Sequence, residues 1–186
     1  MKRLIDFFLA TTLATFFFVP LIMIFIINKF FPKFQLIHWS RRIGVNGKEF
    51  LMPKIRTMKI GAPNVASDLL KNPNFHLTKI GSLLRKYSLD EIPQIWSIFK
   101  GDMSFVGPRP ALYNQYELIK LRKINDIDRL LPGLTGWAQI NGRDSLSLVE
   151  KINYEKEYLD KKSIIFDLKI IYLTVKLTVS KKNISH

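Results

Sequence analysis

Two adjacent carboxylates, Asp90 and Glu91, stand in a segment that is dense in charged and rigid residues. Within residues 84 to 110 the pair is accompanied by several lysines and arginines, by Gly101 and Gly107, and by three prolines. An ionised carboxylate beside cations can attack phosphorus, and a second carboxylate can hold a divalent cation that neutralises phosphate charge. These residue types and their spacing predict an active site for chemistry at phosphorus.

The two carboxylates need different roles, because neighbouring side chains on a helix point roughly 100° apart. Ser88 and Glu91 have the spacing of a capping box, which predicts that a helix begins at Ser88 and that its dipole keeps Asp90 ionised. The alternative is that Ser88, Asp90 and Glu91 only cap a helix. Taken alone, the four-residue pattern favours this alternative, because such patterns are frequent.

Several basic residues are candidates to bind a phosphorylated substrate. A diphosphate requires several cationic contacts, and arginine offers two parallel N–H groups to phosphate oxygens. The strongest candidate is Arg109, because Pro108 and Pro110 restrict its backbone and lower the entropy lost on ordering. For each arginine the alternative is a role at the solvent-exposed or lipid-facing surface. The candidates are Lys54, Arg56, Arg85, Arg109 and Arg143.

Other metal motifs are weak. The chain has no cysteine and its three histidines are far apart, so a bound metal is expected to be a hard cation such as Mg²⁺, held by carboxylates and phosphates. Glu91 is the predicted ligand and Asp102 is the next candidate. Asp126 and Asp128 imitate an Asp-x-Asp metal motif, but the basic residues around them favour a solvated helix face.

The elements that must position these side chains predict an α/β fold class, a small catalytic domain with a β-hairpin and several helices. The hairpin is predicted within residues 34 to 60, where Gly44 to Lys48 form the turn. Residues 107 to 110 must be extended, because a residue before proline disfavours the helical region. The other predicted elements are a loop with one short helix at residues 61 to 75, helices at 78 to 86, 111 to 131 and 160 to 182, and a strand-like segment at 134 to 143.

Residues 7 to 27 carry no charge and are long enough to span a bilayer as a helix. Cations flank both ends, so the positive-inside rule draws both ends to the cytoplasmic side. Pro20 lies near the middle, where it removes a backbone hydrogen bond and favours a bend. We therefore predict a permanent anchor, not a cleaved signal peptide, formed by a re-entrant helix bent at Pro20, with a crossing helix as the alternative.

The chain is expected to divide into a membrane helix with its linker, residues 1 to 33, and a catalytic domain, residues 34 to 186. In the helix predicted at 160 to 182, lysines recur at seven-residue spacing from Lys162 to Lys176. This pattern predicts an amphipathic helix in the membrane interface, with packing on the domain's own core as the alternative. The net charge of +14 indicates an anionic partner: nucleic acid, anionic lipid or a phosphorylated substrate.

Six ordered segments, spread over nearly the whole chain, carry most of the glycine, proline and charged motifs: Arg42 to Phe50, Lys54 to Met58, Ser88 to Gln94, Gly101 to Pro110, Pro132 to Gly136, and Gln139 to Arg143. Together they resemble the bacterial sugar transferases, and among them the small monotopic phosphoglycosyl transferases. The chain departs from this family at Val19, where serine usually precedes the proline, at Ile55, which replaces a common phenylalanine, and at Trp39-Ser40.

The resemblance implies transfer of a sugar-1-phosphate from a UDP-sugar to undecaprenyl phosphate, with release of UMP, as the first membrane step of surface glycan assembly. By the same resemblance, Asp90 is the nucleophile that forms a covalent phosphosugar intermediate, and Glu91 serves Mg²⁺. The sugar is expected to be an N-acetylated hexosamine, and the location the cytoplasmic face of the bacterial inner membrane.

The expected partners are the UDP-sugar, undecaprenyl phosphate and anionic inner-membrane lipids, without nucleic acid; a homodimer stays open. Two functions of other classes compete with this interpretation. A membrane-tethered nucleic-acid-binding protein, suggested by the charge, predicts salt-sensitive binding that is indifferent to Asp90. A non-catalytic membrane scaffold predicts that UDP-sugars are ignored.

Overall fold

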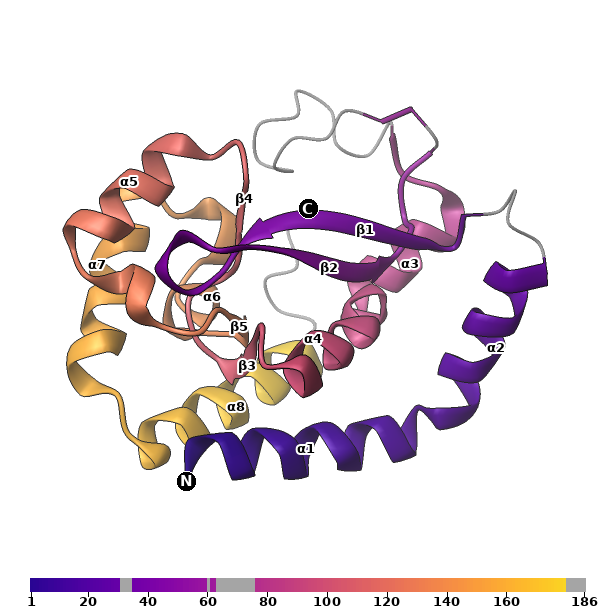
Figure 1. Cartoon of the computed structure of the whole chain (residues 1–186), viewed down its shortest axis with the longest axis horizontal. Coiled ribbons are helices and arrows are strands. Elements are labelled where there is room, and N and C mark those ends of the chain that lie inside the picture. Colours follow the sequence, from indigo (N-terminus) through magenta and orange to yellow (C-terminus); the bar gives the residue numbers. More distant parts are fainter. Residues whose placement is uncertain (31–34, 60, 63–75, 180–186) are drawn as a thin grey trace.

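The computed structural model describes residues 1–30, 35–59, 61–62 and 76–179 as a small mixed α/β domain (Figure 1). One sheet has the strand order β2-β1-β4 and a second pairs β3 with β5, with helices around both. The predicted α/β class is confirmed. The short helix predicted within residues 61 to 75 falls almost entirely outside the described residues.

The predicted hairpin is confirmed: β1 (Ile37–Ile43) pairs antiparallel with β2 (Glu49–Ile55) across a short helical turn, η2 (Val45–Gly47). Asn46 and Gly47 adopt positive φ values of 54° and 77°, a conformation that asparagine and glycine tolerate. Successive side chains of a strand point to opposite faces. His38, Ser40 and Arg42 therefore share one face of β1, which proves to be the face of the site.

The acid pair follows α3 (Lys79–Lys86), which begins where the Thr78 hydroxyl accepts a hydrogen bond from Gly81 N. The helix predicted at 78 to 86 is confirmed, but the capping box predicted at Ser88 is wrong. A side-chain cap requires an extended backbone, whereas Ser88 is left-handed at φ 54° and its side chain makes no capping bond. Asp90 and Glu91 instead lie in the 3-10 helix η5 (Leu89–Gln94), which continues into α4 (Ile95–Lys100).

Between residues 111 and 143 the structure differs from the prediction in two places. The helix predicted at 111 to 131 is split into β4 (Ala111–Leu112), α5 (Tyr116–Ile124) and η6 (Ile127–Arg129), with Asp126 left-handed between the helices. The strand-like segment predicted at 134 to 143 is strand only in β5 (Gly133–Thr135). The chain then forms α6 (Trp137–Ile140) and the turn η7 (Arg143–Ser145).

β5 pairs in parallel with β3 (Ser104–Val106). The backbone of β5 also lies very close to the turn that follows β3. A Cβ atom on Gly133 would lie 2.1 Å from Gly107 N, and one on Gly136 would lie 2.1 Å from Gly107 O. Side chains at these positions would force the two segments apart. The glycines therefore allow the 107 to 110 turn to lie directly against β5.

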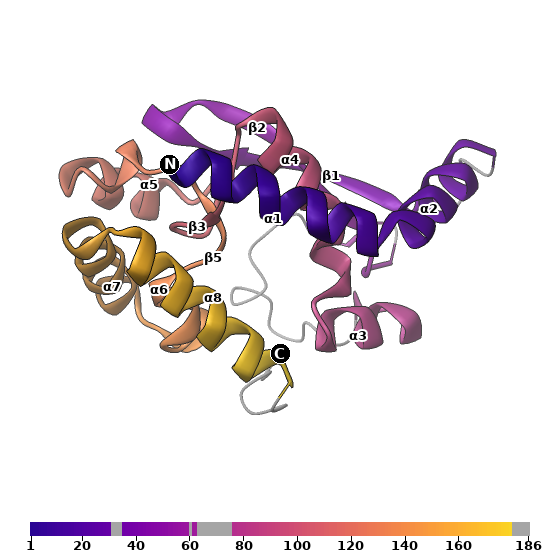
Figure 2. The same cartoon turned by 90° about the horizontal axis from the view of Figure 1, so that it is seen from below.

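Two long helices complete the domain. α7 (Leu148–Lys161) begins at a capping box formed by Ser147 and Glu150, the motif that the sequence pattern predicts at Ser88 and Glu91. The helix predicted at 160 to 182 is divided, because residues 160 and 161 end α7 and α8 (Ile164–Val179) begins after Lys162, which therefore lies outside the predicted lysine stripe. α8 docks on the domain through the fully buried Ile170, so the predicted packing on the domain's own core is confirmed. The opposite face of α8 exposes four apolar side chains: Ile165, Leu168, Tyr172 and Val175. Figure 2 shows α8 running beside α1 on one side of the molecule.

The apolar N-terminal segment forms α1 (Lys2–Phe16) and α2 (Phe18–Phe30). Among the described helices, none is long and apolar enough alone to cross a bilayer, although α1 and the first part of α2 meet that criterion as a pair bent by 73°. The bend falls at Phe17, one turn before Pro20, because proline cannot donate the hydrogen bond that would reach the carbonyl four residues earlier. Leu21 N resumes the pattern by donating to Phe17 O.

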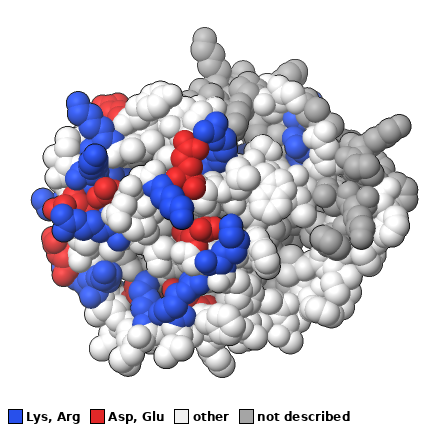
Figure 3. All heavy atoms as spheres, in the orientation of Figure 1, with Lys and Arg blue, Asp and Glu red and all other residues white. Residues whose placement is uncertain are grey.

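The two halves of this segment have different surroundings. α1 packs against α4 and buries Ala10 completely, so it lies along the domain. α2 extends away from the domain (Figure 1), and the described atoms that Figure 3 shows on that side are almost all uncharged. Phe18, Val19 and Phe30 are exposed on α2. The domain itself therefore covers one side of α1, whereas α2 keeps several apolar side chains exposed.

The first turns of α1 are fastened to the domain by polar contacts. Lys2 Nζ donates to Val106 O at 3.1 Å and forms an ion pair with Asp167 on α8. The buried Asp6 carboxylate accepts hydrogen bonds from Ser104 Oγ and Phe105 N, both at 3.0 Å. The beginning of α1 therefore lies against β3, immediately before the turn that carries Arg109.

Candidate active site

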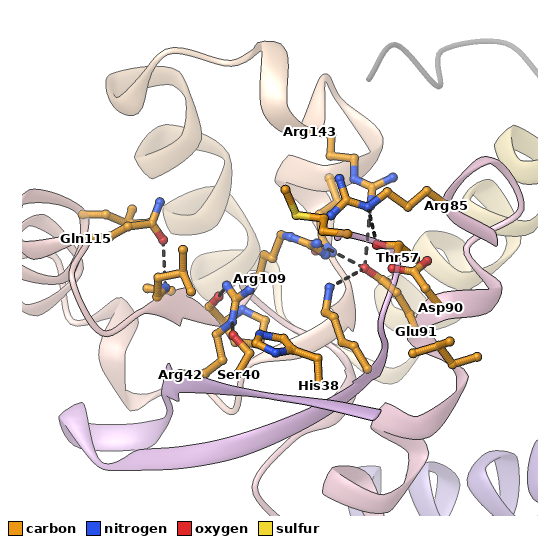
Figure 4. Close-up of a pocket in the computed structure, with 18 of the residues that line it drawn as sticks. His38, Ser40, Arg42, Thr57, Arg85, Asp90, Glu91, Arg109, Gln115 and Arg143 are labelled. Atoms are coloured by element: carbon orange, nitrogen blue, oxygen red, sulfur yellow. Dashed lines mark hydrogen bonds and ion pairs between the residues drawn. The ribbon is translucent and has the colours of Figure 1, made fainter. Parts of the chain in front are cut away.

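One cavity of about 210 Å³ brings together all the basic and acidic residues predicted from the sequence, apart from the alternative metal candidates (Figure 4). Its walls come from one face of the hairpin, the α3–η5 segment, the 107 to 110 turn with β4, α5, and the segment from α6 to α7. The predicted residues on its walls are Lys54, Arg56, Arg85, Asp90, Glu91, Arg109 and Arg143.

Glu91 is the centre of a cluster of cations. Its Oε1 atom lies 3.2 Å from Lys54 Nζ, 3.1 Å from Arg109 Nη2 and 3.7 Å from Arg143 Nη2. Burial alone would raise the pKa of Glu91, but the attraction of these three cations outweighs it and holds the pKa well below its usual range. Glu91 is therefore ionised at neutral pH and holds the three cations close together.

Asp90 lies beside this cluster and is only 7% exposed. Burial raises its pKa above the usual 3.8, although the attraction of Lys54 and Arg85 opposes the shift. A helix N-terminus would lower the pKa of Asp90. The pKa is raised because the cost of removing the carboxylate from water exceeds any stabilisation of its charge by the N-terminus of η5. The ion pairs of Lys54, Arg109 and Arg143 are made with Glu91, whereas Lys54, Arg85 and Arg109 act on Asp90 by charge attraction.

Two predicted arginines have different positions relative to the acid pair. Arg85 donates to Thr57 Oγ1 at 2.9 Å and is close enough to Asp90 for their charges to attract. Burial lowers the pKa of Arg85. Arg56 lines the cavity, but its Nε donates to Gln35 O at 2.9 Å and the structure does not bring it to Glu91.

The sequence analysis missed several polar side chains of the site. Arg42 donates to Ser40 Oγ at 3.0 Å and to Pro110 O at 2.9 Å, and burial lowers its pKa to about 9. His38 completes this row on β1, and Gln115 lies at the end of the cavity away from Asp90 (Figure 4). Lys151 also lines the cavity. The period-two spacing of polar residues in the predicted hairpin is the signal that could have identified the β1 row.

The alternative metal candidates lie elsewhere. Asp102 pairs with Lys100 at 3.0 Å, and Asp126 pairs with Arg129 on an exposed surface, as the solvated-face interpretation predicts. In the described part of the chain no three histidine or acidic side chains gather as a metal site. Mg²⁺ commonly takes one or two carboxylates and completes its shell with water and substrate phosphates. Asp90 and Glu91 fit that mode, with substrate oxygens as the missing ligands.

The charge of the cavity selects an anionic ligand. Among the described residues, nine lysines and arginines and only three carboxylates line it. A concave site with such an excess of cations raises the local concentration of anions and stabilises phosphate charge. The cations are suited to bind a diphosphate, and the Asp90 carboxylate lines the same cavity.

Comparison with known proteins identifies similar chains. The family model described as bacterial sugar transferase matches residues 1–181. The uncharacterized sugar transferase EpsL of Bacillus subtilis is 40% identical over 146 residues, 77% of this chain and 69% of that protein. The exopolysaccharide production protein ExoY of Rhizobium meliloti is 34% identical over 94% of this chain and 83% of its own length. The UDP-glucose:undecaprenyl-phosphate glucose-1-phosphate transferase of Escherichia coli is 36% identical over 94% of this chain but only 39% of that protein.

Proposed function

Because the chain belongs to the bacterial sugar transferase family, we propose that it transfers a sugar-1-phosphate from a UDP-sugar to undecaprenyl phosphate. The observation that carries this proposal is the cation-lined cavity with Asp90 beside the Glu91 cluster. The Escherichia coli relative is named for this reaction with glucose. The product would begin the assembly of a surface glycan.

The reaction would proceed in two displacements at phosphorus. The Asp90 carboxylate attacks the β-phosphorus of the UDP-sugar, the bond to the bridging oxygen breaks, and UMP leaves with that oxygen. A phosphate oxygen of undecaprenyl phosphate then attacks the aspartyl-phosphosugar, which frees Asp90 and forms a polyprenyl diphosphate sugar. The substrate phosphates would take over part of the ion pairing that Glu91 makes with Lys54, Arg109 and Arg143. Mg²⁺, when bound at Glu91, would neutralise further diphosphate charge.

The reaction is tested by measuring UMP release from a panel of UDP-sugars with undecaprenyl phosphate present. An N-acetylated hexosamine stays our prediction for the sugar, and the panel must include UDP-glucose and UDP-galactose, which relatives are named for. We expect one of these sugars to give UMP at a rate that depends on the lipid acceptor. No UMP from any of them would reject the proposed function.

The pH dependence of this reaction should show the charge of Lys54. Burial lowers the pKa of Lys54 from 10.5 to about 8, although Glu91 opposes the shift, so the cation predominates below about pH 8 and is lost above it. Because kcat/KM reports the free enzyme, kcat/KM should fall as pH rises through about 8. Lys54→Arg should move this fall to higher pH, since a guanidinium keeps its proton.

A control for this profile is the exposed Lys161, which pairs with Glu157 away from the cavity. Lys161→Met should leave the pH profile unchanged. If the wild-type kcat/KM stayed constant up to about pH 10, the lowered pKa of Lys54 would have no part in substrate binding.

We also propose that the protein sits on the cytoplasmic face of the bacterial inner membrane, with α1 and α2 as a re-entrant anchor among anionic lipids. Two observations support a segment that returns to the side it left. Lys2 and Asp6 bind the domain at the beginning of α1, and the chain continues from α2 into β1 of the same domain. Exposed apolar side chains on α2 and on the outer face of α8 would contact lipid.

Single cysteines test this topology, because the chain has none of its own. Leu4→Cys in α1 and Lys120→Cys in α5 both change exposed side chains. In intact cells a membrane-impermeant thiol reagent should label neither position, and after lysis it should label both. Labelling of Leu4→Cys alone in intact cells would show that the helix crosses the membrane.

A further inference from the structure

The turn that carries Arg109 is fixed by its carbonyl groups. Residues 107 to 110 connect β3 to β4, and three successive carbonyls here accept hydrogen bonds from distant parts of the chain. Gly133 N donates to Pro108 O at 2.8 Å, Arg122 Nη2 donates to Arg109 O at 2.9 Å, and Arg42 Nη1 donates to Pro110 O at 2.9 Å. The backbone on both sides of the Arg109 side chain is therefore held at several points.

Arg122 is the one of these donors that is itself held by a buried acid. It lies on α5 and is 7% exposed, and Glu155, on α7, is 2% exposed. Arg122 Nε lies 2.8 Å from Glu155 Oε2, and Nη2 is shared between Glu155 Oε1 and the Arg109 carbonyl. A buried ion pair costs desolvation energy, and a hydrophobic pair could join α5 to α7 at lower cost. The guanidinium supplies what a hydrophobic side chain lacks, a donor for the Arg109 carbonyl.

We propose that Arg122, oriented by Glu155, is a positioning residue for diphosphate binding: it fixes the backbone of Arg109 so that the Arg109 guanidinium stays beside Glu91, where the phosphates bind. This inference rests on the proposed function of the cavity. A long side chain loses less entropy on binding when its backbone is already ordered. Removing the donor would take away the Arg122 hydrogen bond to the Arg109 carbonyl and allow the guanidinium to move from its place, 3.1 Å from Glu91 Oε1.

Two other roles for Arg122 must be distinguished from this one. Arg122 and Glu155 also line the cavity, so Arg122 could contact the substrate directly. The pair could also serve only to hold α5 against α7. Both roles act independently of the Arg109 side chain, whereas a positioning role acts through it. A double-mutant cycle between positions 122 and 109 separates these cases.

The test measures UDP affinity by calorimetry for the wild type, Arg122→Lys, Arg109→Ala and the double variant. Lysine at position 122 keeps the charge and can pair with Glu155, but its side chain is one bond shorter than that of arginine, so an ammonium held at Glu155 does not reach the Arg109 carbonyl as Nη2 does. We expect Arg109→Ala to weaken UDP binding by about tenfold or more, and Arg122→Lys by about fivefold. In the Arg109→Ala background, Arg122→Lys should change the affinity by less than about twofold.

Equal weakening by Arg122→Lys in both backgrounds, or no effect in the wild-type background, would overturn the inference. Arg129→Lys is the matched control: it changes an exposed arginine that pairs with Asp126, and it should leave UDP affinity unchanged. If circular dichroism shows that Arg122→Lys does not fold, Glu155→Gln replaces it in the same cycle. Glu155→Gln weakens the ion pair that orients the Arg122 guanidinium. It should weaken UDP binding in the wild-type background and have little effect on UDP affinity in the Arg109→Ala background.

The cycle also separates this inference from the proposed reaction. If wild-type protein binds UDP but releases no UMP from any UDP-sugar, the reaction is wrong and the affinities still decide the role of Arg122. If wild-type protein does not bind UDP, both the diphosphate site and the positioning role are rejected.

Discussion

Replacing Asp90 with asparagine should lower the rate of UMP release by about a thousandfold or more, because the amide keeps the shape of the side chain but has no anionic oxygen to attack phosphorus. Lys54, Arg109 and Arg143 form their ion pairs with Glu91, so Asp90→Asn should leave these pairs in place. Steady-state UMP release with undecaprenyl phosphate present measures the effect. Asp126→Asn, at an exposed ion pair, is the control and should retain full activity.

A second measurement tests the two-step scheme directly. Mixing the wild type with UDP-sugar in the absence of lipid should place a phosphosugar on Asp90, which mass spectrometry of a peptide containing residue 90 can detect. Near wild-type turnover by Asp90→Asn would show that another group is the nucleophile. Full activity without any trapped adduct would favour direct transfer from the nucleotide to the lipid.

Chelation of divalent cations should abolish activity, and Mg²⁺ should restore it. The three cations around Glu91 can neutralise part of a diphosphate, but the leaving UMP carries further charge that a metal ion can stabilise. We expect EDTA to lower UMP release by about a hundredfold or more, and Mg²⁺ in excess of the chelator to restore it. Full activity in EDTA would reject a metal requirement.

Glu91→Gln tests where that metal binds. The amide is a poor ligand for Mg²⁺, so the concentration of Mg²⁺ that gives half-maximal activity should rise. Asp102→Asn is the matched control, because Asp102 pairs with Lys100 outside the cavity. An unchanged Mg²⁺ requirement in Glu91→Gln would assign the metal to other ligands and leave Glu91 with the single task of holding Lys54, Arg109 and Arg143 together.

Local patterns were sufficient to predict the elements whose determinants are close in sequence. The hairpin depends on two apolar stretches and a turn at Asn46 and Gly47, and α3 depends on the Thr78 cap. The capping box assigned to Ser88 failed because the backbone there is left-handed, which four residues of sequence do not reveal. The same motif forms at Ser147 and Glu150, where the chain is free to begin a regular helix.

By itself the sequence determined which side chains are available for chemistry: an acid pair, a set of cations suited to phosphate, and an apolar segment bent at a proline. It could not determine which acid receives which cation, because Lys54 and Arg109 approach Glu91 from 37 and 18 residues away. The tertiary structure decided that Glu91 takes the ion pairs and that Arg56 turns to Gln35. It also decided that the pKa of Asp90 is raised, since that shift depends on burial, which only the packing of distant segments creates.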